Sequence, residues 1–107
     1  MKRQRRVHPK ADAELEAAAD WYGARSVGLA EEFLGQIGDA IAAISDWPFA
    51  SPEFPGWDEL PLVRSRALRS FPFRVVYYTT EDRVTVLAYA HIKREPSYWR
   101  ARYADRF

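Results

Sequence analysis

The sequence predicts a single α+β domain spanning residues 1–107, in which a hairpin of two helices packs on one face of a small antiparallel sheet. Three observations predict it. Apolar residues recur at helical spacing up to residue 46, and they alternate along three segments after residue 61. Between these regions, residues 47–61 hold four of the seven prolines, which indicates a loop. The expected order of elements is β-α-α-β-β-β-α, ending in a short C-terminal helix.

The N-terminal half is expected to form an edge strand and two helices. Residues 2–8 suit a short strand, and Pro9 suits the first turn of a helix that ends at Gly23. Residues 29–46 predict a second helix, because one face carries Phe33, Ile37, Ile41 and Ile44. The short link between the helices makes them an antiparallel hairpin.

Three further expectations concern the packing of this half. Trp21 and Tyr22 are expected to pack in the core or between the helices. Gly35 and Gly38 lower helix propensity, and we therefore expect them to allow a close approach of the first helix. The proline-rich stretch 47–61, which also contains two tryptophans, is expected to form a packed loop without a regular element.

The C-terminal half is expected to supply three strands, at residues 62–70, 73–80 and 83–91. A tight turn over residues 80–83 joins the last two as a hairpin. In the third strand, strict alternation assigns one face to Val84, Val86, Ala88 and Ala90, and the other to Thr85, Leu87, Tyr89 and His91. Pro96 then begins the final short helix.

The net charge of +1 conceals a strong segregation of charge along the chain. Residues 1–10 contain five basic residues and no acid, whereas residues 11–59 contain eleven acids and the single basic residue Arg25. Residues 60–107 contain ten basic residues and four acids. This pattern predicts a positive sheet beside negative helices. Such a surface suits either a charged partner or attraction between the helices and the sheet.

Composition excludes several classes of protein. The chain has no cysteine, so it has no disulfide or thiolate metal site, as is usual in the cytoplasm. Two histidines are too few for a metal constellation, and no glycine-rich phosphate loop is present, so we expect no metal and no cofactor. No apolar run is long enough to span a membrane, and no hydrophobic segment follows the basic N-terminus as in a secretory signal.

Several short motifs occur in a recognisable order. The first helix ends in Trp21-Tyr22, the second contains Phe33-Leu34, and an arginine-containing strand closes in Phe71-Pro72-Phe73-Arg74. Near the end of the chain, residues 86–91 read Val-Leu-Ala-Tyr-Ala-His and residues 94–99 read Arg-Glu-Pro-Ser-Tyr-Trp. In this order and spacing the motifs resemble the RelE/ParE toxin superfamily of type II toxin–antitoxin systems, also called plasmid stabilisation proteins. The fold implied by the resemblance is the one expected above.

The resemblance implies a growth-inhibiting toxin that forms a hetero-oligomer with a cognate antitoxin in the cytoplasm. RelE-like members cut messenger RNA in the ribosomal A site, whereas ParE-like members poison DNA gyrase. We expect a ParE-like toxin that acts by binding, with gyrase as its target. The alternatives are a ribosome-dependent mRNA endoribonuclease and an inactive toxin-fold protein that binds only the antitoxin. Whether the protein is an enzyme stays open at this point.

Matching the chain to RelE-like enzymes gives the candidate catalytic residues of an RNase. Arg74 and Arg94 would clamp phosphate, while His91 or Tyr98 would transfer protons. Arg64 and Arg66 fall where those enzymes carry lysines, and arginine is a poor general base. Arg100 stands where the enzymes have a late tyrosine. This incomplete acid/base set favours a protein that binds its target rather than one that cleaves RNA.

The candidate surface for binding the target or the antitoxin consists of basic and aromatic residues in the C-terminal half: Arg64, Arg66, Arg69, Arg74, Arg94, Trp99 and Arg100. The antitoxin is expected to cover the basic sheet, or the groove beside the helical hairpin, with an acidic amphipathic tail. Structural alternatives remain for these residues. The arginines suit a solvated strand face, His91 suits a strand end bonded to the last helix, and Tyr98 and Trp99 suit packing of that helix.

Overall fold

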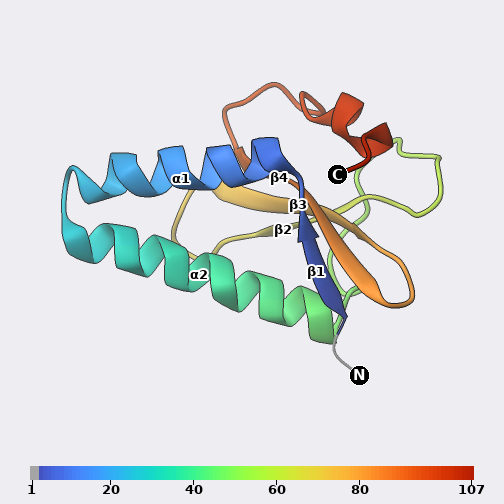
Figure 1. The fold of residues 1–107 in the computed structure, drawn as a ribbon, viewed down its shortest axis with the longest axis horizontal. Helices are drawn as coiled ribbons and strands as arrows, with labels where there is room; N and C mark the ends of the chain where they lie inside the picture. Colours follow the sequence, from blue (N-terminus) through green and yellow to red (C-terminus); the bar gives the residue numbers. More distant parts are fainter. Residues whose placement is uncertain (1–2) are drawn as a thin grey trace.

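The computed structural model describes residues 3–107 and has the predicted order of elements (Figure 1). Two antiparallel helices lie on one face of a four-stranded sheet, and the chain ends in a short 3₁₀ helix, η1. The elements are β1 Gln4–Val7, α1 Pro9–Gly23, α2 Val27–Asp46, β2 Arg64–Ala67, β3 Phe73–Thr79, β4 Arg83–His91 and η1 Arg100–Ala104. Residue 2, the first of the predicted edge strand, lies outside the described residues. No helix within residues 3–107 is both long and apolar enough to cross a membrane.

The sheet has the strand order β1-β4-β3-β2. The last three strands pair antiparallel as predicted, but β1 pairs parallel with β4, so the sheet is mixed rather than antiparallel throughout. The two helices and two other strands separate β1 from β4 in the chain. No short hairpin therefore constrains the direction in which β1 enters the sheet.

Both helices follow the sequence prediction closely. α1 begins at Pro9, and the His8 side chain caps it because its Nδ1 accepts a hydrogen bond from the Lys10 backbone N–H at 3.0 Å. α1 ends at Gly23, as expected. α2 begins at Val27, two residues earlier than predicted, because the extended Ser26 already serves as its N-cap residue.

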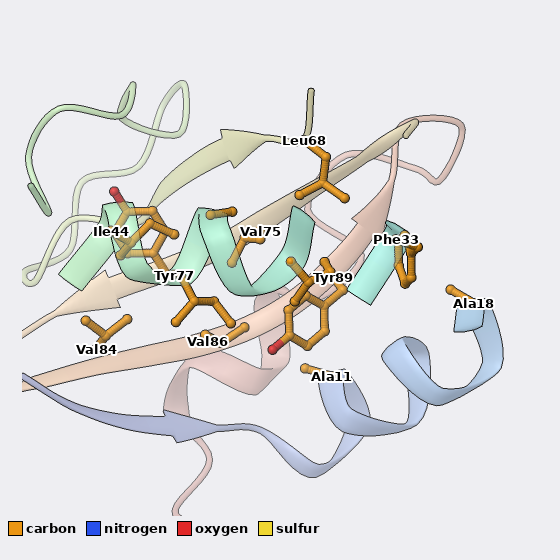
Figure 2. Close-up of a cluster of buried hydrophobic side chains, with 13 residues drawn as sticks. Ala11, Ala18, Phe33, Ile44, Leu68, Val75, Tyr77, Val84, Val86 and Tyr89 are labelled. Carbon is orange, nitrogen blue, oxygen red and sulfur yellow. The ribbon is translucent and has the colours of Figure 1, made fainter. Parts of the chain in front are cut away.

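The first hydrophobic core lies between the helices and the sheet (Figure 2). Phe33 and Ile44 of α2 face Val75 and Tyr77 of β3, and Ala18 of α1 closes one end. Ile37 and Ile41 complete the predicted apolar face of α2. The expectation for the glycines is wrong: a Cβ atom at Gly35 or Gly38 would meet nothing within 4 Å, so neither position is a close helix contact.

An irregularity in the pairing of β3 with β4 changes the faces of β4. Val76 pairs with Ala88 whereas Tyr77 pairs with Val86, so Leu87 is an extra residue in β4. The predicted strict alternation is therefore wrong beyond this point. Ala88 lies on the same side as Leu87, and Tyr89 turns toward the helices.

A second core lies on the opposite face of the sheet, beneath loop residues 54–63 and the segment that follows β4. It contains Trp57, Val63, Val76, Leu87, Ala88 and Trp99. Residues 47–61 form no helix or strand apart from an isolated bridge at Glu53, as predicted. The expected packing holds for Trp57, which is 7% exposed, but not for Trp47, which is 71% exposed. The sheet is thus covered on both faces.

Two further predictions need correction. The terminal helix does not begin at Pro96: the only helical turns after β4 are those of η1, and Ser97 adopts a positive φ of 66° that a regular helix excludes. In the helical hairpin, Tyr22 packs against the first core, but Trp21 is 53% exposed. Trp21 is therefore not a core residue, and it borders the groove described next.

Candidate functional site

Two hollows meet at residues 91–98, the segment that joins β4 to η1. The larger hollow, the α1 groove, has a volume of about 620 Å³ and lies between α1 and the adjoining ends of β3 and β4. The smaller hollow, the Arg74 pocket, has a volume of about 180 Å³. Three side chains, those of His91, Arg94 and Tyr98, line both hollows. The segment is therefore a wall that the two hollows share.

Small residues of α1 create the α1 groove. Ala17 and Ala18 stand where larger side chains would fill the space, and Tyr22 and Phe73 line the groove beside them. Tyr22 is held in place by aromatic neighbours, with its ring centroid 4.8 Å from that of Phe71. Most of the groove lining is consequently apolar and is anchored to the first core.

A buried ionic network forms the polar end of the groove. Glu14 of α1 accepts hydrogen bonds from both terminal nitrogens of Arg102, at 3.0 and 3.1 Å. It also accepts one from the Tyr89 backbone N–H at 3.2 Å and one from the Tyr98 hydroxyl. The Arg102 Nη1 atom also donates to the Leu87 carbonyl at 3.0 Å. This network ties η1 and the segment before it to α1 and β4.

The network determines the protonation of Tyr98. Burial, followed by its hydrogen bond to the Glu14 carboxylate, raises the pKa of Tyr98 well above the ordinary value for tyrosine. The hydroxyl proton is already donated to Glu14. Tyr98 is therefore held in its neutral form and is a poor proton donor or acceptor for a substrate at neutral pH.

Arg94 lies at the edge shared by the two hollows. The carbon of its guanidinium group is 3.9 Å from the centroid of the Tyr98 ring, a cation–π contact. Arg94 forms no ion pair with any carboxylate of residues 3–107. The neighbouring His91 packs edge-on against Phe73, and its Nδ1 accepts a hydrogen bond from the Lys93 backbone N–H at 3.0 Å. Of these two groups, Arg94 is the one that keeps an unneutralised charge.

The Arg74 pocket lies on the face of the sheet away from the helices. Arg74 is opposite Ala90, which packs against the second core. Its guanidinium donates to the Ser65 hydroxyl at 2.9 Å and to the Ser65 carbonyl at 3.2 Å. These bonds fix the orientation of Arg74 and use two of its nitrogen atoms.

The structure brings together five of the predicted site residues and separates the others from them. Arg74, His91, Arg94, Tyr98 and Trp99 all line the Arg74 pocket. Arg64 and Arg66 pair with Tyr77 and Val75, which belong to the helix-side core, so they lie on the opposite face of the sheet from Arg74. The cationic residues therefore do not form one continuous strand surface.

Four of the predicted residues, Arg64, Arg69, Trp99 and Arg100, have mainly structural contacts. Arg64 donates to the Ser51 carbonyl at 2.9 Å, and Arg69 pairs with Asp39 in an exposed ion pair. Trp99 is 2% exposed and packs against Phe54 and Trp57. Arg100 is exposed and lies over the ring of Trp57.

Sequence reasoning missed Glu14 and Arg102, the charged residues at the centre of the network. A signal for Glu14 was present, because its spacing from Ala11 and Ala18 places a carboxylate within the buried stripe of α1. A carboxylate in such a stripe needs a buried partner. Within residues 3–107 no group of three or more His, Asp or Glu side chains is arranged to hold a metal ion.

Comparison with known proteins identifies the family. A family model described as the ParE toxin of the type II toxin–antitoxin system parDE matches residues 5–103. The chain belongs to the ParE toxin family. Like other ParE family members, it is a toxin of a type II toxin–antitoxin system. Comparison with curated protein sequences found no match.

Among solved structures, the fold of this ParE family member is similar to a chain of the chromosomal ParDE toxin–antitoxin system from P. aeruginosa. The TM-score is 0.64 at 21% sequence identity, over 84% of this chain and 96% of the other. At this identity the similarity supports the fold.

Proposed function

We propose that this ParE toxin binds and poisons DNA gyrase in the cytoplasm and that a cognate antitoxin holds it inactive in a hetero-oligomer. The observation that carries the proposal is the state of Tyr98. Its hydroxyl is bonded to Glu14, and burial and that bond raise its pKa, so the tyrosine best placed for proton transfer is not available. The residues support binding better than RNA cleavage.

The position of the arginines supports the same conclusion. RNA cleavage by a RelE-like mechanism needs a base and an acid beside the phosphate clamp. Arg64 and Arg66 are on the other face of the sheet from Arg74, and arginine is a poor base. The α1 groove, by contrast, is an apolar hollow of the kind that binds other molecules.

A gyrase assay with supercoiled plasmid tests the proposal. We expect the purified toxin to trap the gyrase–DNA cleavage complex, so that linear plasmid accumulates when the protein is removed with detergent and protease. The same toxin premixed with its antitoxin should give no linear plasmid. A reaction that contains the plasmid and the toxin but no gyrase is the control for contaminating nuclease.

A ribosome-dependent endoribonuclease is the second candidate, because Arg74, His91, Arg94 and Tyr98 line one pocket. Primer extension on cellular mRNA after induction without antitoxin distinguishes the two. Two results together would contradict the gyrase proposal. The mRNA would be cleaved in register with codons by the wild-type toxin but not by Arg74→Ala, and gyrase activity would be unaffected. Absence of any growth arrest would instead indicate an inactive protein that binds only its antitoxin.

A further inference from the structure

β1 is an edge strand of the sheet, and β4 is the strand that it pairs with (Figure 1). The Gln4 backbone N–H donates to the Asp82 carbonyl at 2.9 Å, on the side of β4. Successive N–H groups of a strand point to opposite edges, so the N–H of Arg5 points away from β4. An edge strand of this kind offers backbone donors to a partner.

Four arginines lie along this edge, and we call them the basic edge: Arg3, Arg5, Arg6 and Arg83. Arg5 is in register with Val84, whose side chain belongs to the helix-side core, so Arg5 lies on that side of the strand. Arg6 alternates with Arg5 and lies on the other face. Arg83 lies on β4 opposite Gln4. The positive charges therefore flank the open edge on both faces of the sheet.

None of the four arginines of the basic edge forms an ion pair with a carboxylate of residues 3–107. Arg3 donates instead to the Thr80 and Ser45 carbonyls, at 3.2 and 3.4 Å. The Arg6 guanidinium lies over the Phe107 ring. Neither contact neutralises a positive charge, so the edge keeps its full charge for a partner.

We propose that the basic edge binds the phosphate backbone of double-stranded DNA. The inference rests on the proposed function in one respect: duplex DNA is the substrate that the proposed target holds. A guanidinium group binds phosphate through two parallel hydrogen bonds. A duplex carries one negative charge per about 1.7 Å of its axis, so one stretch of backbone can reach several arginines at once. The outward N–H of Arg5 is a further donor for a phosphate oxygen.

The composition of the basic edge favours DNA over a protein partner. The buried centre of a protein interface is enriched in aromatic and other apolar side chains. None of the exposed large apolar side chains of residues 3–107 belongs to β1 or to the turn before β4. Interfaces with DNA are polar and strongly positive, as this edge is. A second copy of the chain is disfavoured as well, because two basic edges repel each other.

Fluorescence anisotropy with a labelled DNA duplex of mixed sequence tests the inference without gyrase. We expect the affinity to fall as salt is added, with a slope of about 0.9 in log–log form for each phosphate bound. Arg5→Gln should lower that slope by about 1 and weaken binding about eightfold at a salt concentration of about 0.1 M. Arg25→Gln is the matched control, because Arg25 is also exposed and has no carboxylate partner within residues 3–107. It should leave both quantities unchanged.

The same two variants in the gyrase assay show whether poisoning uses the DNA contact. Arg5→Gln should need a higher toxin concentration than wild type to give the same amount of linear plasmid, and the difference should follow the loss of DNA affinity. Arg25→Gln should match wild type. Arg5 is exposed, so its replacement leaves both cores intact, and thermal unfolding confirms that each variant is folded.

Specific results would overturn the inference. An equal salt slope in Arg5→Gln and wild type, or an equal loss of affinity in Arg25→Gln, would show that the basic edge does not hold DNA. Tighter binding of an RNA duplex would assign the edge to RNA, and tighter binding of poly-L-glutamate would assign it to an acidic protein. Gyrase poisoning without DNA binding through Arg5 would refute this inference alone. A toxin that binds DNA through Arg5 but leaves gyrase unaffected would refute the proposed function alone.

Discussion

Glu14 shows how one residue connects the fold to the site. It occupies the buried stripe of α1, where an unpaired carboxylate would be costly, and it is stabilised by Arg102 and Tyr98. Its side chain is 16% exposed and that of Arg102 is 11% exposed. The bonds fix the segment between β4 and η1, which carries Arg94, and they form the polar end of the α1 groove.

Removing Glu14 should strongly destabilise the protein. Glu14→Ala leaves Arg102 buried without a counter-charge, so we expect a loss of about 3–5 kcal/mol in the free energy of unfolding, measured with urea. Adding Arg102→Leu should recover part of this loss, because the pair is coupled. Asp39→Ala breaks the exposed pair with Arg69 and should cost at most about 1 kcal/mol. If Glu14→Ala and Asp39→Ala lowered the free energy of unfolding equally, the buried pair would not be the more important of the two.

The tyrosines predict how stability depends on pH. Burial raises the pKa of Tyr89 from 10.0 to about 12. The folded protein then keeps the proton to a higher pH than the unfolded chain does. The resulting stabilisation is complete below pH 10 and is lost as the pH rises from 10 toward 12, at about 1.4 kcal/mol per pH unit for this tyrosine.

Calorimetry between pH 8 and pH 11 measures this effect. The Tyr89 hydroxyl makes no hydrogen bond within residues 3–107, so Tyr89→Phe should be close to wild type in stability at pH 7. The variant should lose less stability than wild type above pH 10. An unchanged alkaline slope would show that Tyr89 ionises equally in both states. Tyr98→Phe should behave differently, because it also removes a donor from Glu14 and should cost about 1–2 kcal/mol at neutral pH.

At the scale of the elements, the start of α1 and the end of the chain are joined. His8 Nε2 lies 2.8 Å from Asp105 Oδ2, while His8 Nδ1 accepts from the Lys10 N–H. With Nδ1 as acceptor, the neutral imidazole carries its proton on Nε2 and donates to Asp105. The Phe107 ring packs on His8, and the Arg6 guanidinium lies over Phe107. One imidazole therefore caps a helix and holds the C-terminus.

Substitutions at His8 and Asp105 separate these two roles. We expect His8→Ala to cost about 1–2 kcal/mol in urea unfolding, because it removes the cap as well as the bond to Asp105. His8→Asn should recover part of the loss, since asparagine is a good cap residue. Asp105→Ala should cost less than about 1 kcal/mol because its side chain is 52% exposed. If Asp105→Ala and His8→Ala lowered the free energy of unfolding equally, the helix cap at His8 would not contribute to stability.

The limits of sequence reasoning are also clearest in the elements. The helices and β4 were predictable because periodicity, Pro9 and Gly23 agree on their bounds. The faces of β4 were not, because one extra residue at Leu87 reverses every later side chain, and apolar residues occupy both faces. The parallel direction of β1 and the 3₁₀ form of η1 depend on tertiary contacts that no local pattern contains.

For the whole molecule, the sequence identified the basic residues but not their division between two faces. Arg74 and Arg94 line one pocket. Arg64 and Arg66 were predicted to join them because they fall where RelE-like enzymes carry lysines, yet the register of β2 with β3 places them on the helix side. The α1 groove was predicted only as one of two places where the antitoxin could bind. Its shape was not predicted, because it depends on the small side chains of Ala17 and Ala18 facing the ends of β3 and β4.

The shared wall at residues 91–98 has a consequence for inhibition. A ligand that draws the Arg94 guanidinium off the Tyr98 ring and into the α1 groove simultaneously removes a positive charge from the Arg74 pocket. A ligand in one hollow therefore changes the charge of the other hollow, although ligands bound in the two hollows do not touch. A compound that binds the α1 groove would thereby weaken or strengthen ligand binding in the Arg74 pocket, on the opposite face of the sheet.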